Sequence, residues 1–297
     1  MKIGIPLSKS AYTPESYAYH SFLINKGFSV QLDYNLDPNN DINIHYMGLD
    51  PIWEKENGRS IVIHEYQSLS TPPFSKVKNF IKKNVNKKPS GRIFLNEVVK
   101  KDMSFKDRVP YLKRDMGIDK HFFQNTLKDP EFDIIYCGSI AGRVGLISEI
   151  IRLSLLGFTI QVVGRVDLNT MQNLRKYNNI KLWGQVSREY LPELYRNSRY
   201  GLNFTPDIYP FNIQTSTKVL EYIASNLIVL SNKYEWISDF SENNSIDVIW
   251  IDKIDNKSKI YERNLNTQKN NFIKDLEWNI LLDKSDFHTF LLGLVNN

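Results

Sequence analysis

Short apolar runs alternate with helical patterns along most of this chain, in two successive series. This alternation predicts strands joined by crossover helices, and therefore parallel α/β sheets of the doubly wound type. The first series predicts a helix over 14–26, capped by Thr13, and strands at 2–7, 28–32, 42–46, 60–64, 92–96 and 109–112. The second predicts helices at 145–156, 168–176, 188–197 and 216–224, and strands at 132–137, 158–164, 180–183, 201–204 and 227–231.

The two series predict two Rossmann-like domains of unequal size, with sheets that face a central cleft. A length of 297 residues accommodates both. We place the first domain at 1–125 and the second at 126–270. Residues 271–297 carry an apolar helical pattern, mainly over 275–295. A helix there could cross back to the first domain.

Cys137 is the single cysteine, which excludes an internal disulfide framework and a Cys-based zinc site. It ends an apolar run, and we expect a packed thiol. The N-terminal residues include no apolar segment of signal-peptide length. The most apolar stretch, 146–164, contains Glu149 and Arg152, which argues against a membrane-spanning helix. We expect a cytoplasmic location.

A glycine-rich loop, 138–145, follows one predicted strand and opens a helix. Glycines let the backbone approach a ligand closely, and a helix N-terminus favours phosphate oxygens. Arg143 adds a group that can bind a diphosphate through charge-assisted hydrogen bonds. The spacing of the glycines differs from the dinucleotide fingerprint, so an ordinary turn with a solvent-facing Arg143 is the alternative.

The helix predicted at 216–224 places Lys218, Glu221 and Tyr222 on one face and its apolar residues on the other. A polar face beyond the strand ends offers a carboxylate to ribose hydroxyls and a helix N-terminus to a phosphate. The alternative is a surface Lys–Glu pair worth a few tenths of a kcal/mol.

His64 ends the apolar run 61–64, which predicts a histidine at the ligand edge of the first domain. The alternative is a structural histidine. Glu65 would raise the basicity of His64 if the two side chains touched.

Residues 71–120 carry eleven lysines and three arginines against five acidic residues, a local balance of +9 in a chain of net charge +5. Within them, Phe74, Val77, Ile81 and Val85 recur at helical spacing among lysines. Segment 74–88 is therefore predicted to be a basic amphipathic helix suited to an anionic membrane surface. The alternative is a helix that packs its apolar stripe on its own domain. No nucleic-acid fold signature accompanies the charge, and we expect no nucleic-acid partner.

No Asp-x-Asp pair occurs, and the five histidines show no metal-ligand spacing. We therefore expect no metal site.

The second half of the chain resembles the nucleotide-sugar domain of GT-B glycosyltransferases, especially glycosyltransferase family 4. The similar segments, in the family's order, are RVPYLKRDMGIDKHFF, YCGSIAGRVG, NIKLWGQVSREYLPELYRNSRYGLNFTPD, TSTKVLEYIASNLIVLSN and LEWNILLDK. The resemblance extends from about residue 108 to 290. It implies the GT-B fold and metal-independent sugar transfer from a nucleotide-diphosphate donor, UDP- or GDP-linked, with retention of configuration and no cofactor.

By this resemblance, Glu221 holds the ribose and His64 approaches the donor sugar. The residues that it places around the donor diphosphate are Gly138, Ser139, Arg143, Ser216, Thr217 and Lys218, with the backbone of 138–142. We expect Val186 to contact the base. The acceptor is expected to be a glycan, polyprenyl- or lipid-linked, in surface polysaccharide synthesis (O-antigen or capsule), at the inner face of the cytoplasmic membrane.

The sequence departs from the family at two places. The family's first glutamate lies eight positions before the second, where this chain has Ile213; Asp207, Asn212, Gln214 and Thr215 are the nearby polar replacements. The Gly-Gly loop common near the N-terminus is absent from 6–14. Three other functions remain open: a GT-B nucleotide-sugar epimerase, a Rossmann-type oxidoreductase, and a non-catalytic nucleotide-binding protein at the membrane.

Overall fold

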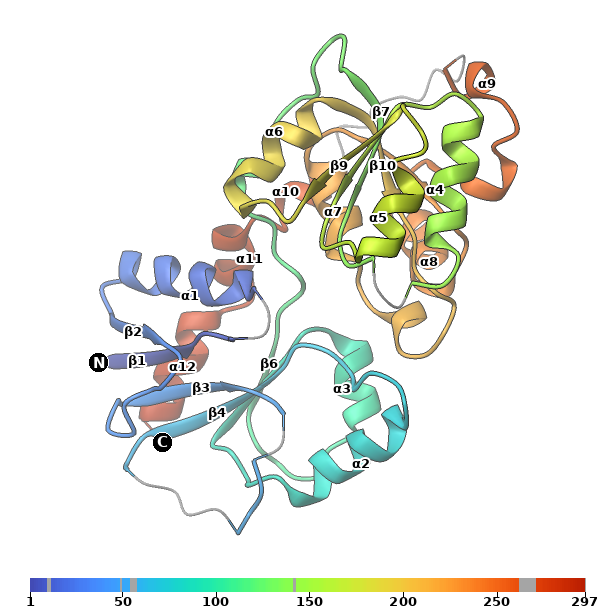
Figure 1. Cartoon of the computed structure of the whole chain (residues 1–297). Helices are drawn as coiled ribbons and strands as arrows, with labels where there is room; N and C mark the ends of the chain where they lie inside the picture. The colour runs from blue at the N-terminus through green and yellow to red at the C-terminus, as the bar shows by residue number, and fades with distance from the viewer. Residues whose placement is uncertain (10–11, 49, 54–57, 141–142, 262–270, 297) are drawn as a thin grey trace. The chain divides into compact units, whose positions relative to one another are not determined.

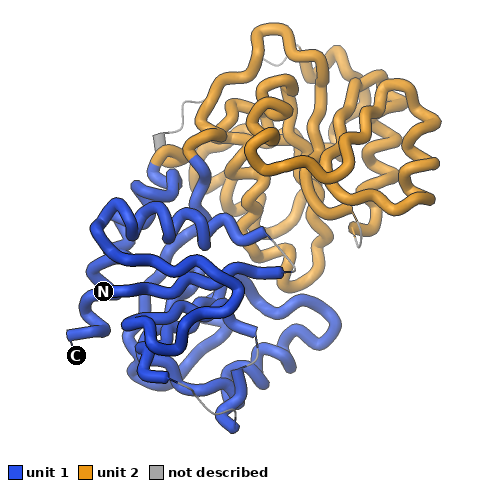
Figure 2. The backbone as a smooth tube through the Cα atoms, turned by 60° about the vertical axis from the view of Figure 1, so that its left-hand side comes forward, with its two compact units in different colours: residues 1–119, 275–297 blue, residues 120–274 orange. Residues whose placement is uncertain are grey.

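The computed structural model describes residues 1–9, 12–48, 50–53, 58–140, 143–261 and 271–296. They form two compact units, residues 1–119 with 275–297 (unit 1) and residues 120–274 (unit 2) (Figure 2). The sequence predicts domain boundaries after residues 125 and 270, and the two units of the structure divide after residues 119 and 274. The C-terminal segment belongs to the same unit as the N-terminal strands.

Unit 1 contains a six-stranded parallel sheet in the order β2-β1-β3-β4-β5-β6. Its strands are β1 (Lys2–Pro6), β2 (Ser29–Asp33), β3 (Ile42–Tyr46), β4 (Ile61–Tyr66), β5 (Gly91–Phe94) and β6 (Tyr111–Lys113). The strand predicted at 42–46 has the bounds found. The one predicted at 60–64 extends to Tyr66, because Glu65 and Tyr66 continue the pairing with β5.

One face of this sheet packs on α1 (Pro14–Asn25), α11 (Trp278–Lys284) and α12 (Phe287–Val295) (Figure 1). The core contains Ile3, Ile44 and Ile63 from the strands, and Leu23 and Phe287 from the helices. Alternate residues of each strand face this layer, which accounts for the isoleucine spacing. The chain's end therefore completes the core of the first unit.

The C-terminal pattern predicted as one helix forms two. The chain turns at Ser285 and Asp286, and Asp286 has φ +56° in the left-handed region. Aspartate tolerates this conformation better than most residues, so it ends one helix and begins the next.

Unit 2 contains a second six-stranded parallel sheet, in the order β9-β8-β7-β10-β11-β12. Its strands are β7 (Phe132–Cys137), β8 (Ile160–Val163), β9 (Ile180–Gly184), β10 (Ser198–Asn203), β11 (Ile228–Ser231) and β12 (Val248–Trp250). The strand predicted at 132–137 is found at those bounds, and all six of its residues are buried. This is the doubly wound strand order, which reverses between β7 and β10.

The helices of unit 2 are α4 (Leu146–Leu155), α5 (Leu168–Leu174), α6 (Leu191–Arg196), α7 (Thr217–Ala224), α8 (Glu235–Asn243), α9 (Lys257–Tyr261) and α10 (Asn271–Lys274). Leu146, Ile150 and Leu153 pack from α4 onto Ile134 and Tyr200 of the sheet. The sequence patterns do not predict α8 or β12. In unit 1 they also miss α3 (Glu97–Met103), although Asn96 caps it by accepting a bond from Val99 N at 3.0 Å.

The basic helix predicted near 74–88 is α2 (Ser75–Val85), and it packs with its polar side inward. Asn79 is buried; its Nδ2 donates to Asp102 Oδ2 at 2.9 Å, and its Oδ1 accepts from Ser70 N. The apolar residues Phe74, Val77, Phe80 and Ile81 are instead 42–76 % exposed. Val85, the last residue of the predicted stripe, is half-buried. The alternative that this stripe packs on its own domain is therefore wrong for Phe74, Val77 and Ile81.

Candidate functional site

The candidate site lies at the carboxyl edge of the sheet in unit 2, where the strand order reverses. In doubly wound sheets, ligands bind beyond the strand ends at this switch point. Cys137 and Asn203 are the last residues of the two strands concerned, β7 and β10. The segments that follow them, 138–145 and 204–216, are the ones expected to contact a ligand.

Arg143 joins these two segments. Its Nη1 donates to the carbonyl oxygen of Phe204 and lies 3.5 Å from Thr205 Oγ1. A Cβ atom added to Gly145, whose φ is +91°, would meet the Phe204 ring at 3.2 Å. Arg143 therefore fixes one segment to the other, and the alternative of a solvent-facing side chain is wrong.

The glycines of the first segment allow a second close approach. A Cβ atom on Gly164, which follows β8, would lie 2.1 Å from the carbonyl oxygen of Gly138. Both glycines have positive φ, at +147° and +153°. Ser139 follows, and its carbonyl oxygen accepts a bond of 2.6 Å from Tyr136 Oη. The expected ligand residues 141 and 142 lie outside the described residues.

A polar network holds the start of α7 at this edge. Ser216 occupies the N-cap position, but its hydroxyl donates to Asn203 Oδ1 at 3.0 Å and makes no bond to the helix. Asn203 Nδ2 donates in turn to Ser231 Oγ at 2.8 Å and Tyr234 Oη at 3.0 Å. The first helical residue, Thr217, is thereby placed beside the ends of β10 and β11. Asn203 was not among the predicted site residues.

Glu221 is the centre of a buried charge cluster. Its Oε2 accepts from Lys218 Nζ at 2.8 Å and Tyr195 Oη at 3.1 Å, and its Oε1 accepts from Arg188 Nη2 at 2.8 Å. The carboxylate is 0 % exposed. Burial by itself would raise the pKa of Glu221, but the charges of Lys218 and Arg188 outweigh burial and hold the pKa below its ordinary value.

This arrangement corrects two expectations about α7. Glu221 is buried rather than on an exposed polar face, and Tyr222 belongs to the packed side of the helix. The Tyr222 ring lies against Gly201, and its hydroxyl accepts a bond of 3.1 Å from Cys137 N. Arg188 and Tyr195 were not predicted, because they lie 33 and 26 positions from Glu221 in the sequence.

The region expected to contact a base follows β9. Val186 is half-buried and lies two residues before Arg188. Trp183 is fixed by a bond of 2.8 Å from its Nε1 to Gln161 Oε1 and by edge contact with Tyr190. Val186 therefore lies in the short segment between Trp183 and Arg188, and the side chains of both these residues are held by hydrogen bonds.

No protein-family model and no curated protein matches this sequence. Solved structures match it over its full length. AviGT4, a glycosyltransferase involved in avilamycin A biosynthesis, has a TM-score of 0.63 at 11% identity, covering 100% of this chain and 99% of its own. HepE of Anabaena, in complex with UDP and glucose, has a TM-score of 0.60 at 11% identity, covering 100% and 98%. This chain has the GT-B fold.

A third GT-B structure is the DNA-modifying enzyme β-glucosyltransferase, at a TM-score of 0.55 and 15% identity, with both chains covered to 100%. The sequence resemblance begins near residue 108, but the GT-B similarity in structure includes the strands that precede it. The expected GT-B fold, with two parallel α/β sheets, is therefore confirmed.

In the sheet of unit 1, His64 does not lie where the sequence predicts it. It lies within β4, is 0 % exposed, and pairs in register with His45 and Arg92 on the neighbouring strands. Its Nε2 lies 3.5 Å from Asp50 Oδ2. Burial lowers the pKa of His64 to about 4, although Asp50 opposes the change.

Glu65 does not touch His64, because successive strand residues face opposite sides of the sheet. It is buried on the other face, where its Oε1 accepts from Arg114 Nη2 and from Tyr19 Oη. His64 is thus a neutral, enclosed side chain, and its expected place at the ligand edge is wrong.

Cys137 is a buried free thiol, as expected. Within the described ranges, no three His, Cys, Asp or Glu side chains are grouped closely enough to hold a metal ion. Among the same residues, no helix has the length and apolar character needed to span a bilayer.

Proposed function

We propose that this chain is a glycosyltransferase that moves a sugar from a nucleotide-diphosphate donor to a glycan or lipid-linked acceptor. The observation that carries the proposal is the edge between β7 and β10, where Arg143 joins the two ligand-facing segments beside the N-terminus of α7. The fold supports it, because HepE and the phage T4 β-glucosyltransferase have been crystallised with UDP-glucose. We propose UDP or GDP as the donor's nucleotide.

The donor diphosphate would lie at the N-terminus of α7. Amide groups of Ser216 and Thr217 and the positive end of the helix dipole favour an anion there. Arg143 and Lys218 add positive charge, and Gly138 and Ser139 let the backbone approach. These groups would stabilise the charge that develops on the leaving diphosphate. We propose that they do so without a metal ion and that configuration is retained.

The ribose would bind Glu221. A carboxylate offers about four lone-pair positions, and three are occupied by Arg188, Lys218 and Tyr195. A ribose diol needs two, so we infer that binding exchanges at least one of these contacts for a ribose hydroxyl. Val186 would contact the base. His64 is left out of this proposal because its ring is enclosed in the sheet.

We also propose that the protein meets its acceptor at a membrane. The exposed apolar stripe of α2 lies among Lys76, Lys78 and Lys83, and each such cation contributes about 1 kcal/mol at an anionic surface. Exposed apolar residues among lysines favour an anionic lipid surface as the binding partner of α2. We propose a cytoplasmic protein, peripheral at the inner face of the cytoplasmic membrane, that acts in O-antigen or capsule synthesis.

The decisive experiment incubates the protein with labelled UDP-sugars and GDP-sugars, with and without lipid-linked glycan acceptors. Transfer that persists in EDTA and is lost in Glu221→Gln and Arg143→Ala supports the proposal. The matched controls are Glu149→Gln, in an ion pair of α4, and Arg175→Ala, an exposed arginine of the same unit. Unchanged transfer in both site variants would contradict the assignment of the site.

The other functions give different results in the same assay. Isomerisation of the donor sugar without an acceptor would identify an epimerase. Nucleotide binding with no turnover of any donor would identify a non-catalytic protein, and binding of NAD alone an oxidoreductase. Duplex DNA belongs among the acceptors, because the DNA-modifying β-glucosyltransferase has the same fold.

A further inference from the structure

Among the residues that the structure describes, no helix covers one face of the sheet in unit 1 over β2, β1 and β3. The helices α1, α11 and α12 pack on the opposite face, while α2 and α3 follow β4 and β5. The connections 34–41 and 47–60 contain no helix in the part of the chain that the structure describes. Crossover connections between parallel strands usually carry a helix that covers the sheet, and here two of them do not.

The uncovered face is polar. Gln31, Gly4 and Asn43 form one row across three adjacent strands. Asn43 Nδ2 donates to Ser60 Oγ at 3.0 Å, and Asn40 Nδ2 donates to Asn43 Oδ1 at 2.9 Å and to Gln31 Oε1 at 2.7 Å.

Gly4 makes room for this network, because a Cβ atom there would lie 2.0 Å from Asn43 Oδ1. Asn40 and Asn43 are both buried. The face is thus a fixed polar floor, unsuited to an apolar helix, whose docking would remove polar groups from water.

Above this floor is a hollow of about 700 Å³, within the size range of small-molecule sites. It runs from Ser60, which precedes β4, to Lys9 and Tyr34, which follow β1 and β2. The strands beneath are five to six residues long, so the hollow extends over roughly 16 Å. That length suits an oligosaccharide better than a single ring.

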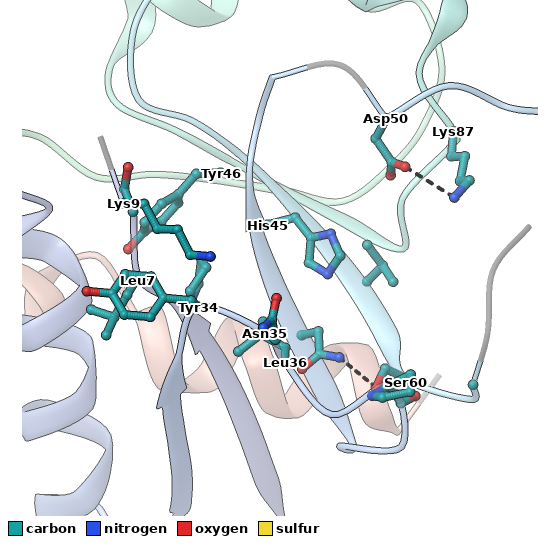
Figure 3. A pocket seen from close by; sticks show the side chains of 16 residues that line it. Leu7, Lys9, Tyr34, Asn35, Leu36, His45, Tyr46, Asp50, Ser60 and Lys87 are labelled. Carbon is teal, nitrogen blue, oxygen red and sulfur yellow. Dashed lines mark hydrogen bonds and ion pairs between the residues drawn. The ribbon is translucent and has the colours of Figure 1, made fainter. Parts of the chain in front are cut away.

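The walls combine aromatic rings with hydrogen-bonding groups. In Figure 3, the His45 ring lies between the group of Lys9 and Tyr34 and the ion pair of Asp50 with Lys87. That ion pair measures 3.1 Å, so much of the positive charge of Lys87 is compensated. Tyr34 is half exposed, with Lys9 Nζ 5.8 Å from the centre of its ring on one face, and the exposed part of the ring can contact the apolar side of a ligand.

We propose that this hollow binds carbohydrate, namely sugar residues of the acceptor glycan, a role that rests on the proposed glycosyltransferase function. Sugar rings present C–H faces that pack on tyrosine, and hydroxyl groups that both donate and accept. Asp50, the side chain of Asn35 and the hydroxyl group of Tyr34 supply matching groups. The polar floor argues against an acyl chain as the occupant.

The test measures binding of maltotriose, cellotriose, triacetylchitotriose and a hyaluronan tetrasaccharide by saturation-transfer NMR and calorimetry. Binding of at least one in the millimolar range, weakened at least tenfold in Tyr34→Ala and His45→Ala, is the expected result. The controls are Tyr111→Ala, an equally exposed tyrosine of the same sheet, and His20→Ala on α1. Folding of each variant is checked by its near-UV circular dichroism.

Three outcomes would overturn the inference: no binding to any of the four sugars, equal binding by all variants, or a dimer in sedimentation that Tyr34→Ala dissociates. UDP binding, measured in parallel, keeps the two proposals distinguishable. UDP binding without sugar binding rejects the hollow and retains the donor site. Sugar binding without UDP or GDP binding rejects the proposed transferase.

Discussion

Arg188 donates from Nη2 to Oε1 of the fully buried Glu221 at 2.8 Å and so joins the segment after β9 to helix α7. Lys218 approaches the other carboxylate oxygen at the same distance. The carboxylate is held between two cations at the edge proposed to bind ribose. The energetic consequence is that removing either cation leaves a buried charge with less compensation.

Arg188→Leu should therefore lower the free energy of unfolding by about 2 kcal/mol, below the range for a wholly uncompensated charge because Lys218 remains. Urea unfolding measures it, and Arg175→Leu, exposed in the same unit, should stay within about 0.5 kcal/mol of wild type. A loss below 0.5 kcal/mol for Arg188→Leu would show that the Arg188–Glu221 ion pair makes no net contribution to the free energy of unfolding.

His64 should make unfolding pH-dependent. Its pKa is about 4 in the folded chain against an ordinary 6.5, so the unfolded chain binds the proton more readily. The stability that this difference provides is complete above pH 6.5 and is lost as the pH falls toward 4, by up to about 3 kcal/mol. Denaturant unfolding at several pH values should show a flatter dependence for His64→Asn. Identical dependence in both proteins would contradict this.

Gly164→Ala should be among the most destabilising glycine substitutions. The new Cβ would lie 2.1 Å from the backbone oxygen of Gly138, at a φ of +147°. We expect a loss of at least about 2 kcal/mol in the free energy of unfolding. Gly157→Ala is the control, because Gly157 also has positive φ, at +88°, but nothing lies within 4 Å of the added atom. Its cost should be about 1 kcal/mol, and equal losses would refute the close approach.

UDP should stabilise the protein if the donor site is as proposed. At a concentration 100 times its Kd, a ligand specific for the folded chain adds about 2.7 kcal/mol. Arg143→Ala should weaken binding about tenfold and remove about 1.4 kcal/mol of that gain. Thermal shift and calorimetry measure both effects, with Arg175→Ala as the matched control. Stabilisation by NAD but not by UDP or GDP would reject the site.

The outward stripe of α2 should govern membrane binding without affecting the fold. Replacing Phe74 and Phe80 by serine should change the free energy of unfolding by no more than about 0.5 kcal/mol, because both rings are exposed. The same protein should lose flotation with vesicles that contain phosphatidylglycerol. Leu155→Ser, exposed on α4 of unit 2, is the control and should float as wild type does. Flotation that is unchanged both by the serine substitutions and by omission of the anionic lipid would exclude α2 as the membrane-binding surface.

Much of the fold could be predicted from local patterns. The run Phe132–Cys137, apolar except for Asp133, predicts a strand buried on both faces, and the structure has a strand at those bounds. The sequence pattern ends the strand that holds His64 two residues too early, and so places that histidine at the edge of the sheet rather than in its interior.

The sequence by itself determined the alternation of strands and helices, and with it two parallel sheets and the strand-end edge at which we propose that the donor binds. The tertiary structure alone decided that Glu221 is buried between Arg188 and Lys218, that Arg143 binds the loop after β10, and that α2 turns Asn79 inward and Phe80 outward. Periodicity reports which residues share a face of a helix or strand. Which face is covered, and which buried charge finds a partner, depends on residues brought together from distant parts of the chain.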